Sequence, residues 1–154
     1  MLATDVLKNN HKAILDLFAH YRRAGGGDHR KKKELFDQIK RAVRMHLGLE
    51  EELLYPAMTR RPSPDAGRRL DGVLQEHLFI DDLLTSLSEL RPQDRQFDQL
   101  MAALRRRVEA HLLLEQRGPY EEIRRALKKQ ALEKLGAQIS ARIDLLSRPA
   151  FPLS

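Results

Sequence analysis

The sequence predicts an all-α protein: an antiparallel up-down-up-down four-helix bundle with an additional C-terminal helix. Apolar residues recur at the helical period along almost the whole chain, and no segment alternates apolar and polar residues as a half-buried strand does. Short runs with glycine or proline separate the helical segments, and short connections favour antiparallel neighbours. With 154 residues, 42% hydrophobic and 32% charged, the chain suits one helical domain with its own core.

The individual helices follow from their caps and from the residues that interrupt them. Thr4 can cap the first helix, which should end before the glycines at 25–27, and Asp28 can cap the second. The other interruptions are Pro62 and Pro64 before a third helix from about Asp65, Pro92 before the fourth, and Gly118–Pro119 after it.

We therefore expect three parts along the chain. Residues 1–118 should form the four-helix bundle, and 119–147 an amphipathic C-terminal helix that packs on the bundle or on a partner subunit. A homodimer could form through this helix. Residues 148–154 should be a flexible tail.

Composition excludes several classes of function. The absence of cysteine rules out disulfides, zinc–thiolate sites and iron–sulfur clusters, so nitrogen and oxygen atoms must hold any metal. The net charge is +6, but the basic clusters are interleaved with acids and lack aromatic neighbours, which argues against a nucleic-acid partner. No signal-peptide run or membrane-spanning stretch is visible, so we expect a cytoplasmic protein with no membrane partner.

Two matching His/Glu pairs, here called couplets, are the most informative candidates for functional residues in the sequence. His46 and Glu50 stand four residues apart on one predicted helix, and His111 and Glu115 do so on another. Residues four apart lie on the same helix face, so each couplet directs an imidazole and a carboxylate to one spot. His11 and His77 each supply one more imidazole from another helix, and with antiparallel helices all six fall within about two and a half turns of one another.

A carboxylate on an inward face is costly unless it is paired or binds a metal, and no Lys or Arg shares the stripe beside Glu50 or Glu115. Metal coordination is therefore the economical interpretation. Imidazole and carboxylate ligands suit iron, zinc, manganese or copper. Two bridging carboxylates with about two histidines per ion leave open coordination positions, as in a di-iron centre. The ferritin-like bundles use Glu-x-x-His instead, so the order His-x-x-x-Glu points to another family.

The chain resembles the hemerythrin-like, or HHE cation-binding, domain over roughly residues 5–120. The resemblance rests on Asn10-His11, on the block from His46 to Pro56, on Glu76-His77 and on His111 to Glu115. It implies a non-haem di-iron centre of two iron ions, oxo- or hydroxo-bridged and carboxylate-bridged by Glu50 and Glu115, with zinc or manganese as alternative metals. The implied ligands are His11, His46, Glu50, His77, His111 and Glu115.

One position departs from the oxygen-carrying members of this family. They have a further histidine four residues after the third-helix histidine, where this chain has Asp81. Asp81 could complete the shell as an additional ligand, and an anionic ligand would disfavour simple reversible oxygen carriage. Glu76 or Glu51 could accept a hydrogen bond from an imidazole, and the Tyr55 phenol could donate one to bound oxygen. His20 and His29 lie near the glycine turn and should face solvent.

The sequence thus predicts a metal-binding protein that binds or reacts with a small species (O₂, NO or peroxide) at an open iron position. No nucleophile constellation or phosphate-binding loop is present, so any enzymatic turnover would have to proceed through the metal. Two alternatives stay open: an iron sensor or storage protein, and a metal-free helical interaction module.

Overall fold

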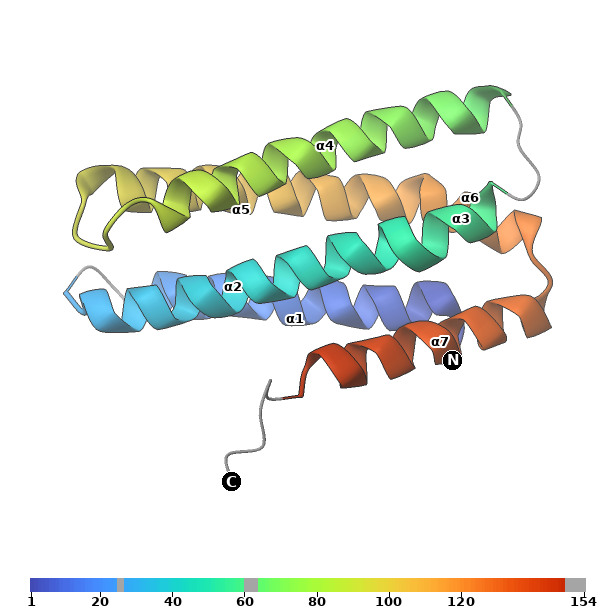
Figure 1. Cartoon of the computed structure of the whole chain (residues 1–154), viewed down its shortest axis with the longest axis horizontal. Helices are drawn as coiled ribbons and strands as arrows, with labels where there is room; N and C mark the ends of the chain where they lie inside the picture. The colour runs from blue at the N-terminus through green and yellow to red at the C-terminus, as the bar shows by residue number, and fades with distance from the viewer. Residues whose placement is uncertain (25–26, 60–63, 149–154) are drawn as a thin grey trace.

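Four long antiparallel helices form the body of the protein. The computed structural model describes residues 1–24, 27–59 and 64–148, and every regular element in these ranges is helical. Each bundle helix runs opposite to the one before it, with one pair layered on the other (Figure 1). The predicted all-α four-helix bundle with an additional C-terminal helical segment is confirmed. The bundle helices are α1 (Ala3–Ala24), α2 (His29–Leu49), α4 (Pro64–Ser88) and α5 (Arg95–Arg117).

The apolar stripes read from the sequence are the faces that these helices bury. In α1 the buried side chains Leu7, His11, Ile14, Phe18 and Tyr21 recur every three or four residues. The stripe of α5 from Phe97 through His111 to Glu115 is buried in the same way. Histidines and glutamates of the couplets therefore lie on core-facing positions, as the periodicity predicts.

The two predicted N-caps have different outcomes. The Asp28 carboxylate accepts a hydrogen bond from the backbone N–H of Lys31 at 3.0 Å, so the cap of α2 is confirmed. The Thr4 cap is wrong, because α1 begins at Ala3 and Thr4 lies inside its first turn. Thr4 is buried, and its Oγ1 accepts a hydrogen bond from Nε of Arg124 at 3.1 Å, so a neighbouring element uses this hydroxyl instead.

The second predicted helix is continuous but not uniform. After α2 the chain passes through a π-helical segment, η1 (Glu50–Leu54), and then the short α3 (Tyr55–Met58). The backbone N–H of Tyr55 donates to the carbonyl of Glu50, five residues earlier, in place of the ordinary bond to the fourth. The π turn therefore starts at one of the predicted metal ligands. The expected loop around Pro62 lies outside the described residues, and α4 begins at Pro64.

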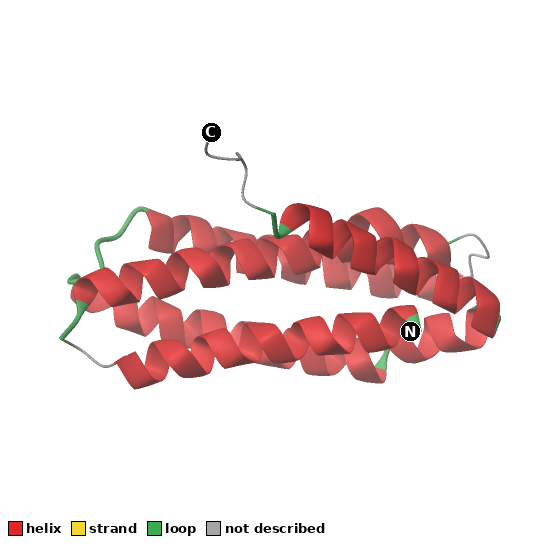
Figure 2. Cartoon of the chain, turned by 90° about the horizontal axis from the view of Figure 1, so that it is seen from below, coloured by secondary structure: helices red, strands yellow, loops and turns green. Residues whose placement is uncertain are grey.

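The C-terminal segment is two helices where we expected one over 119–147. These are α6 (Pro119–Ala126) and α7 (Lys129–Leu146), separated by the extended backbone of Leu127 and Lys128. The break lets α7 turn back along α1 and α2 (Figures 1 and 2). Gly136 permits a close approach there, since a Cβ at this position would overlap the carbonyl oxygen of Met1.

The C-terminal segment therefore belongs to the core of its own chain. Tyr120 and Ile123 of α6 and Leu132 of α7 are buried in the same cluster as Leu7 of α1. A homodimer contact through this segment stays a prediction. Beyond Arg148, the predicted flexible tail lies outside the described residues.

Two apolar clusters fill the molecule, one on each side of a polar layer. We call them the Phe36 cluster and the Tyr120 cluster. The Phe36 cluster comprises Ile14, Phe18, Tyr21, Leu35, Phe36, Ile39, Val43, Leu47, Ile80, Leu84, Leu87, Phe97, Met101, Leu104, Val108 and Leu112. The Tyr120 cluster comprises Ala3, Leu7, Leu49, Leu54, Tyr55, Met58, Leu70, Tyr120, Ile123, Leu132, Leu135 and Ile139.

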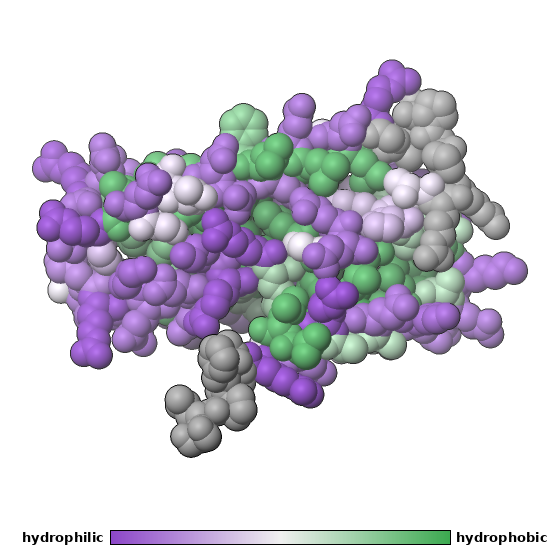
Figure 3. All heavy atoms as spheres, in the orientation of Figure 1, coloured by the Kyte–Doolittle hydropathy of each residue, from purple (hydrophilic) through white to green (hydrophobic). Residues whose placement is uncertain are grey.

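The outer surface is mostly hydrophilic on the face shown in Figure 3, with apolar residues along α4. Among the large apolar side chains of α4, Leu78 and Phe79 are more than half exposed. None of the described helices is long and apolar enough to cross a membrane.

Candidate metal centre

The polar layer between the two clusters holds the six residues predicted as ligands. His11 comes from α1, His46 from α2, His77 from α4, and His111 with Glu115 from α5, while Glu50 is the first residue of η1. Each is at most 3% exposed. Along α1, His11 stands between Leu7 of the Tyr120 cluster and Ile14 of the Phe36 cluster, which shows how tightly the layer is enclosed.

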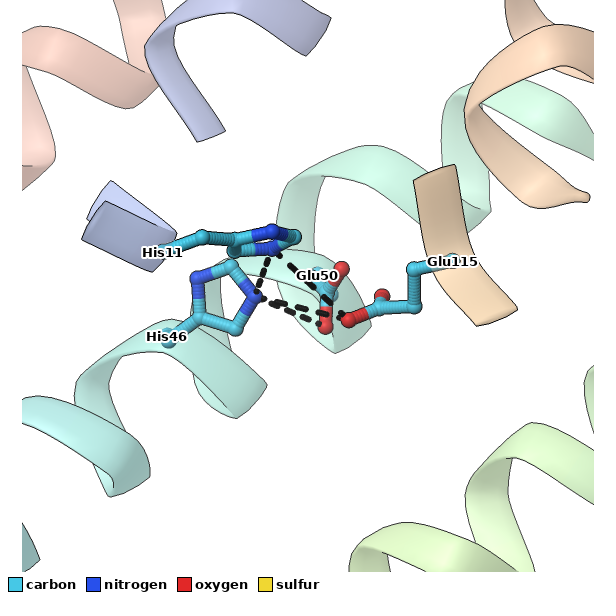
Figure 4. Close-up of side chains that lie close together, drawn as sticks. All are labelled: His11, His46, Glu50 and Glu115. Carbon is cyan, nitrogen blue, oxygen red and sulfur yellow. Dashed lines mark hydrogen bonds and ion pairs between the residues drawn. The ribbon is translucent and has the colours of Figure 1, made fainter. Parts of the chain in front are cut away.

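These six residues form two overlapping groups of four. One consists of His11, His46, Glu50 and Glu115, whose ligand atoms all lie within 4.8 Å of one another; Figure 4 shows the four side chains pointing inward. The other consists of His77, His111 and the same two glutamates, within the same limit. Two carboxylates shared by two pairs of histidines are what a site for two bridged ions requires.

The spacing of the imidazoles fits a metal. Nε2 of His11 lies 3.0 Å from Nε2 of His46, and Nε2 of His77 lies 3.0 Å from Nε2 of His111. Two nitrogens bound about 2.1 Å from one ion at a right angle are about 3.0 Å apart.

The carboxylates supply a second test of fit. Oε1 of Glu50 and Oε1 of Glu115 are buried and accept no hydrogen bond. Oε1 of Glu50 lies 3.4 Å from Nε2 of His46, and Oε1 of Glu115 lies 3.1 Å from Nε2 of His111. Buried carboxylate oxygens without a donor are costly, and a cation would satisfy both.

The outer nitrogens of three histidines have hydrogen-bond partners that hold the rings in place. Nδ1 of His46 lies 2.8 Å from Oδ1 of Asn10, and Nδ1 of His77 lies 2.9 Å from Oε1 of Glu51. Both partners are acceptors, so each Nδ1 carries the proton and each Nε2 presents its lone pair to the centre. Nδ1 of His11 lies 3.2 Å from the side-chain amide of Gln116.

Two tyrosines complete the layer, and they cross between its halves. The Tyr55 hydroxyl donates to Oε2 of Glu115 at 3.1 Å and lies 3.4 Å from Nε2 of His77. The Tyr120 hydroxyl donates to Oε2 of Glu50 at 3.1 Å and lies 2.8 Å from Nε2 of His11. Tyr55 was predicted near the centre. Tyr120 was missed, although the spacing His-x3-Glu-x4-Tyr occurs in both couplets and would have found it.

Two different backbone irregularities orient these tyrosine side chains toward the polar layer. In a regular α-helix the fifth residue after a glutamate points about 140° away from it. The π turn of η1 changes the direction of Tyr55 so that it faces the layer. The helix break at Gly118, before Pro119, does the same for Tyr120.

In the absence of metal, burial and neighbouring groups together set the pKa values of the side chains in the polar layer. Burial and the neighbouring His46 lower the pKa of His11 from 6.5 to about 3. Burial alone would raise the pKa of Glu50, but the nearby His46 and His111 lower it below its ordinary value. Burial first, and then the charge of Glu50, raise the pKa of both Tyr55 and Tyr120, so both phenols keep their protons.

The structure does not bring two of the other predicted residues to the centre. Asp81 pairs with Nε of Arg44 at 2.9 Å, its side chain is half exposed, and it belongs to neither ligand group. Glu76 pairs with Nε of Arg107 at 3.4 Å, and the imidazole acceptor on this side is Glu51. The expectation that Asp81 is an additional ligand is wrong, whereas the role predicted for Glu76 stays a prediction. His20 and His29 are exposed, as expected.

Two uncharacterized mycobacterial proteins are similar to this chain over most of its length. The uncharacterized proteins Rv2633c of Mycobacterium tuberculosis and Mb2666c of Mycobacterium bovis are each 28% identical to this chain over 149 residues, covering 95% of it and 88% of their own length.

A solved structure supports the fold. The crystal structure of a hemerythrin HHE cation-binding domain-containing protein from Mycobacterium kansasii, a homolog of Rv2633c, superimposes with a TM-score of 0.81 at 23% identity. The match covers 95% of this chain and 87% of that one. The model of the hemerythrin HHE cation-binding domain matches residues 2–123, and the chain therefore belongs to the hemerythrin HHE cation-binding domain family.

Proposed function

We propose that this protein binds two iron ions in the polar layer and uses them to bind or react with O₂, NO or peroxide. The observation that carries the proposal is the pair of buried oxygens, Oε1 of Glu50 and Oε1 of Glu115, which lack any hydrogen-bond donor and are surrounded by four imidazoles. Such a cluster of buried polar groups raises the free energy of the folded state unless cations neutralise its charge.

The donor set is compatible with iron, as the proposal requires. His11 and His46 would hold one ion and His77 and His111 the other, with Glu50 and Glu115 shared between them. Nitrogen and carboxylate oxygen suit iron, manganese and zinc. Two redox-active ions with coordination positions not filled by protein supply binding and electron transfer for a small molecule.

The surrounding residues fit a small ligand. The phenols of Tyr55 and Tyr120 remain protonated and lie within hydrogen-bond reach of the ligand atoms. Each phenol has one proton, which it donates to a glutamate oxygen here, so it could donate to a bound species only by exchanging that oxygen for the new acceptor. The apolar clusters on both sides exclude bulk water and favour a small, weakly polar ligand over a large charged one.

Metal content and the visible spectrum of protein from iron-supplemented cells test this proposal first. We expect about two irons per chain with near-ultraviolet charge-transfer bands that change on titration with O₂, NO or peroxide. His77→Ala and His111→Ala should lose the bands, whereas the exposed His20→Ala should keep them. Zinc alone would reject the iron chemistry in favour of another metal, and the absence of any metal would favour the metal-free interaction module.

A second candidate, an iron sensor, is favoured by the position of the cluster between the two halves of the core. Without metal, the buried charges weaken the contact between the Phe36 and Tyr120 clusters, so metal occupancy would control stability. Helicity and melting temperature of the metal-free protein separate the candidates: a large loss of helicity supports a sensor, and unchanged cooperative folding excludes one.

A further inference from the structure

The two halves of the polar layer are built to the same plan. Along the chain, His46, Glu50 and Tyr55 correspond to His111, Glu115 and Tyr120, with identical spacing. The geometry also repeats: both imidazole pairs have Nε2 atoms 3.0 Å apart, and both tyrosines donate to the opposite glutamate at 3.1 Å. Judged by these atoms alone, the two metal positions would be equivalent.

The equivalence ends at the residue after each glutamate. Glu51 follows Glu50 and contacts Nδ1 of His77 at 2.9 Å, whereas Gln116 follows Glu115 and contacts Nδ1 of His11 at 3.2 Å. The two residues occupy matching places and have nearly the same size, but one is a carboxylate and the other an amide. The remaining partner in the His11 half, Asn10, is also an amide.

Among the described residues, no Lys or Arg forms an ion pair with the carboxylate of Glu51. Its side chain is 44% exposed, and it accepts a hydrogen bond from Nδ1 of His77. The adjacent acid, Glu52, differs in this respect, because its carboxylate pairs with Arg142 at 2.6 Å on the surface. Thus only one of these neighbouring acids is connected to the centre.

We propose that Glu51 makes the two metal positions unequal, so that the position at His77 and His111 binds its ion first and more tightly. The inference rests on the proposed two-ion centre. A carboxylate that accepts a hydrogen bond from the Nδ1–H group makes the Nε2 lone pair of the imidazole bind a cation more strongly. Removing such a partner costs about 10- to 100-fold in metal affinity. The neutral side-chain amide of Gln116, whose Nε2 contacts Nδ1 of His11, holds the ring without adding charge.

Titration of the metal-free, full-length protein with Co²⁺ tests the inference, because visible absorbance reports each bound ion without any activity assay. We expect two Co²⁺ ions to bind in two steps that differ about tenfold or more in affinity. Glu51→Gln should weaken the first step until the two merge. Gln116→Glu should tighten the second step towards the first.

Glu52→Gln is the matched control, since it removes the same charge one residue away and should leave both steps unchanged. His111→Gln should abolish the tight step and His46→Gln the weak one, which assigns each step to its half. Circular dichroism checks that every variant keeps its helicity.

The outcomes separate this inference from the proposed function. Two Co²⁺ ions bound in indistinguishable steps, or equal effects of Glu51→Gln and Glu52→Gln, overturn the inference and leave the two-ion centre standing. A wild-type protein that takes up no Co²⁺ overturns both.

Discussion

At the scale of single residues, the polar layer depends on hydroxyl groups as well as on the ligands. The Tyr120 hydroxyl is the donor to Oε2 of the buried Glu50. We expect Tyr120→Phe to destabilise the metal-free protein by about 1–3 kcal/mol, because it leaves a buried carboxylate oxygen unsatisfied. Tyr21→Phe is the control: Tyr21 donates to Asp98, whose side chain is 57% exposed and keeps its ion pair with Lys32. Its loss should be at most about 1 kcal/mol.

Urea denaturation of both variants, with metal removed, measures this difference. Equal losses would show that the tyrosine of the polar layer contributes no more than an ordinary surface hydrogen bond. In that case the crosswise contacts of Tyr55 and Tyr120 would have no special part in holding the glutamates.

A second prediction at this scale concerns pH. The pKa of His11 falls from 6.5 to about 3 on folding of the metal-free protein. Between these values the unfolded chain binds a proton that the folded chain does not, so stability falls as the pH drops through this window. His77, whose pKa burial also lowers, adds to the effect, and Glu50, whose folded pKa is depressed, adds further loss below about pH 4.5.

The loss attributable to His11 is at most roughly 5 kcal/mol. Urea midpoints of the metal-free protein, measured from pH 7.5 down to pH 4, should decrease steadily below about pH 6.5. The decrease should be shallower for His11→Gln. A constant midpoint down to pH 4 would mean that the imidazole is not held neutral in the folded chain.

Residue spacing alone was sufficient to find the six core residues of the layer but not all of their neighbours. The couplets at His46 and His111 follow from helical periodicity, which the structure obeys at those positions. Tyr120 was missed because it follows a helix break that the periodicity does not describe. Asp81 was misplaced because Arg44, on another helix, draws its carboxylate outward, and a sequence does not reveal such a partner.

At the scale of elements, the helices were predictable and their irregularities were not. The π turn at Glu50–Leu54 contains no proline or glycine of its own, and the signal beside it is Pro56, which cannot donate to the carbonyl of Glu52. The break at Leu127 likewise lacks a breaker residue. It follows from the return of α7 onto α1, which is a tertiary preference that overrides local helix propensity.

The contact between α7 and the start of α1 gives a prediction for an element. Gly136→Ala should destabilise the protein by about 1–3 kcal/mol, since its Cβ would meet the backbone of Met1 and Ala3, which cannot rotate away. Gly72→Ala is the control, because Gly72 is an exposed position within α4 with open space around it. There alanine should stabilise by up to about 1 kcal/mol.

Thermal melts of the two glycine variants decide this prediction. Opposite shifts in melting temperature support tight packing of α7 on its own bundle. Two upward shifts would indicate that α7 does not lie against the N-terminus in solution and is free to pack elsewhere, for instance on a second copy of the chain.

At the scale of the whole molecule, the fold and the centre depend on each other. The polar layer separates the Phe36 cluster from the Tyr120 cluster, so ligands that are costly without metal sit where the two halves of the core meet. Metal bound there stabilises the folded state by mass action. The C-terminal helices lie outside the four-helix bundle, yet they contribute Tyr120 to the layer and close the cluster beside it.

This dependence predicts the effect of removing α7 by ending the chain at Ala126. The truncation deletes three buried side chains of the Tyr120 cluster, Leu132, Leu135 and Ile139, each contributing about 1.5–3 kcal/mol. Their sum approaches the whole stability of a typical domain, about 5–15 kcal/mol. We therefore expect the truncated chain to be largely unfolded without metal and to regain helicity when metal is added, because every proposed ligand is retained.

Circular dichroism melts of the full and truncated chains, each with and without added metal, measure this coupling. The full chain should fold in both conditions, with a higher melting temperature in the presence of metal. If the truncated, metal-free chain melts cooperatively within a few degrees of the full one, then α7 is an appendage and the bundle is sufficient to support the polar layer.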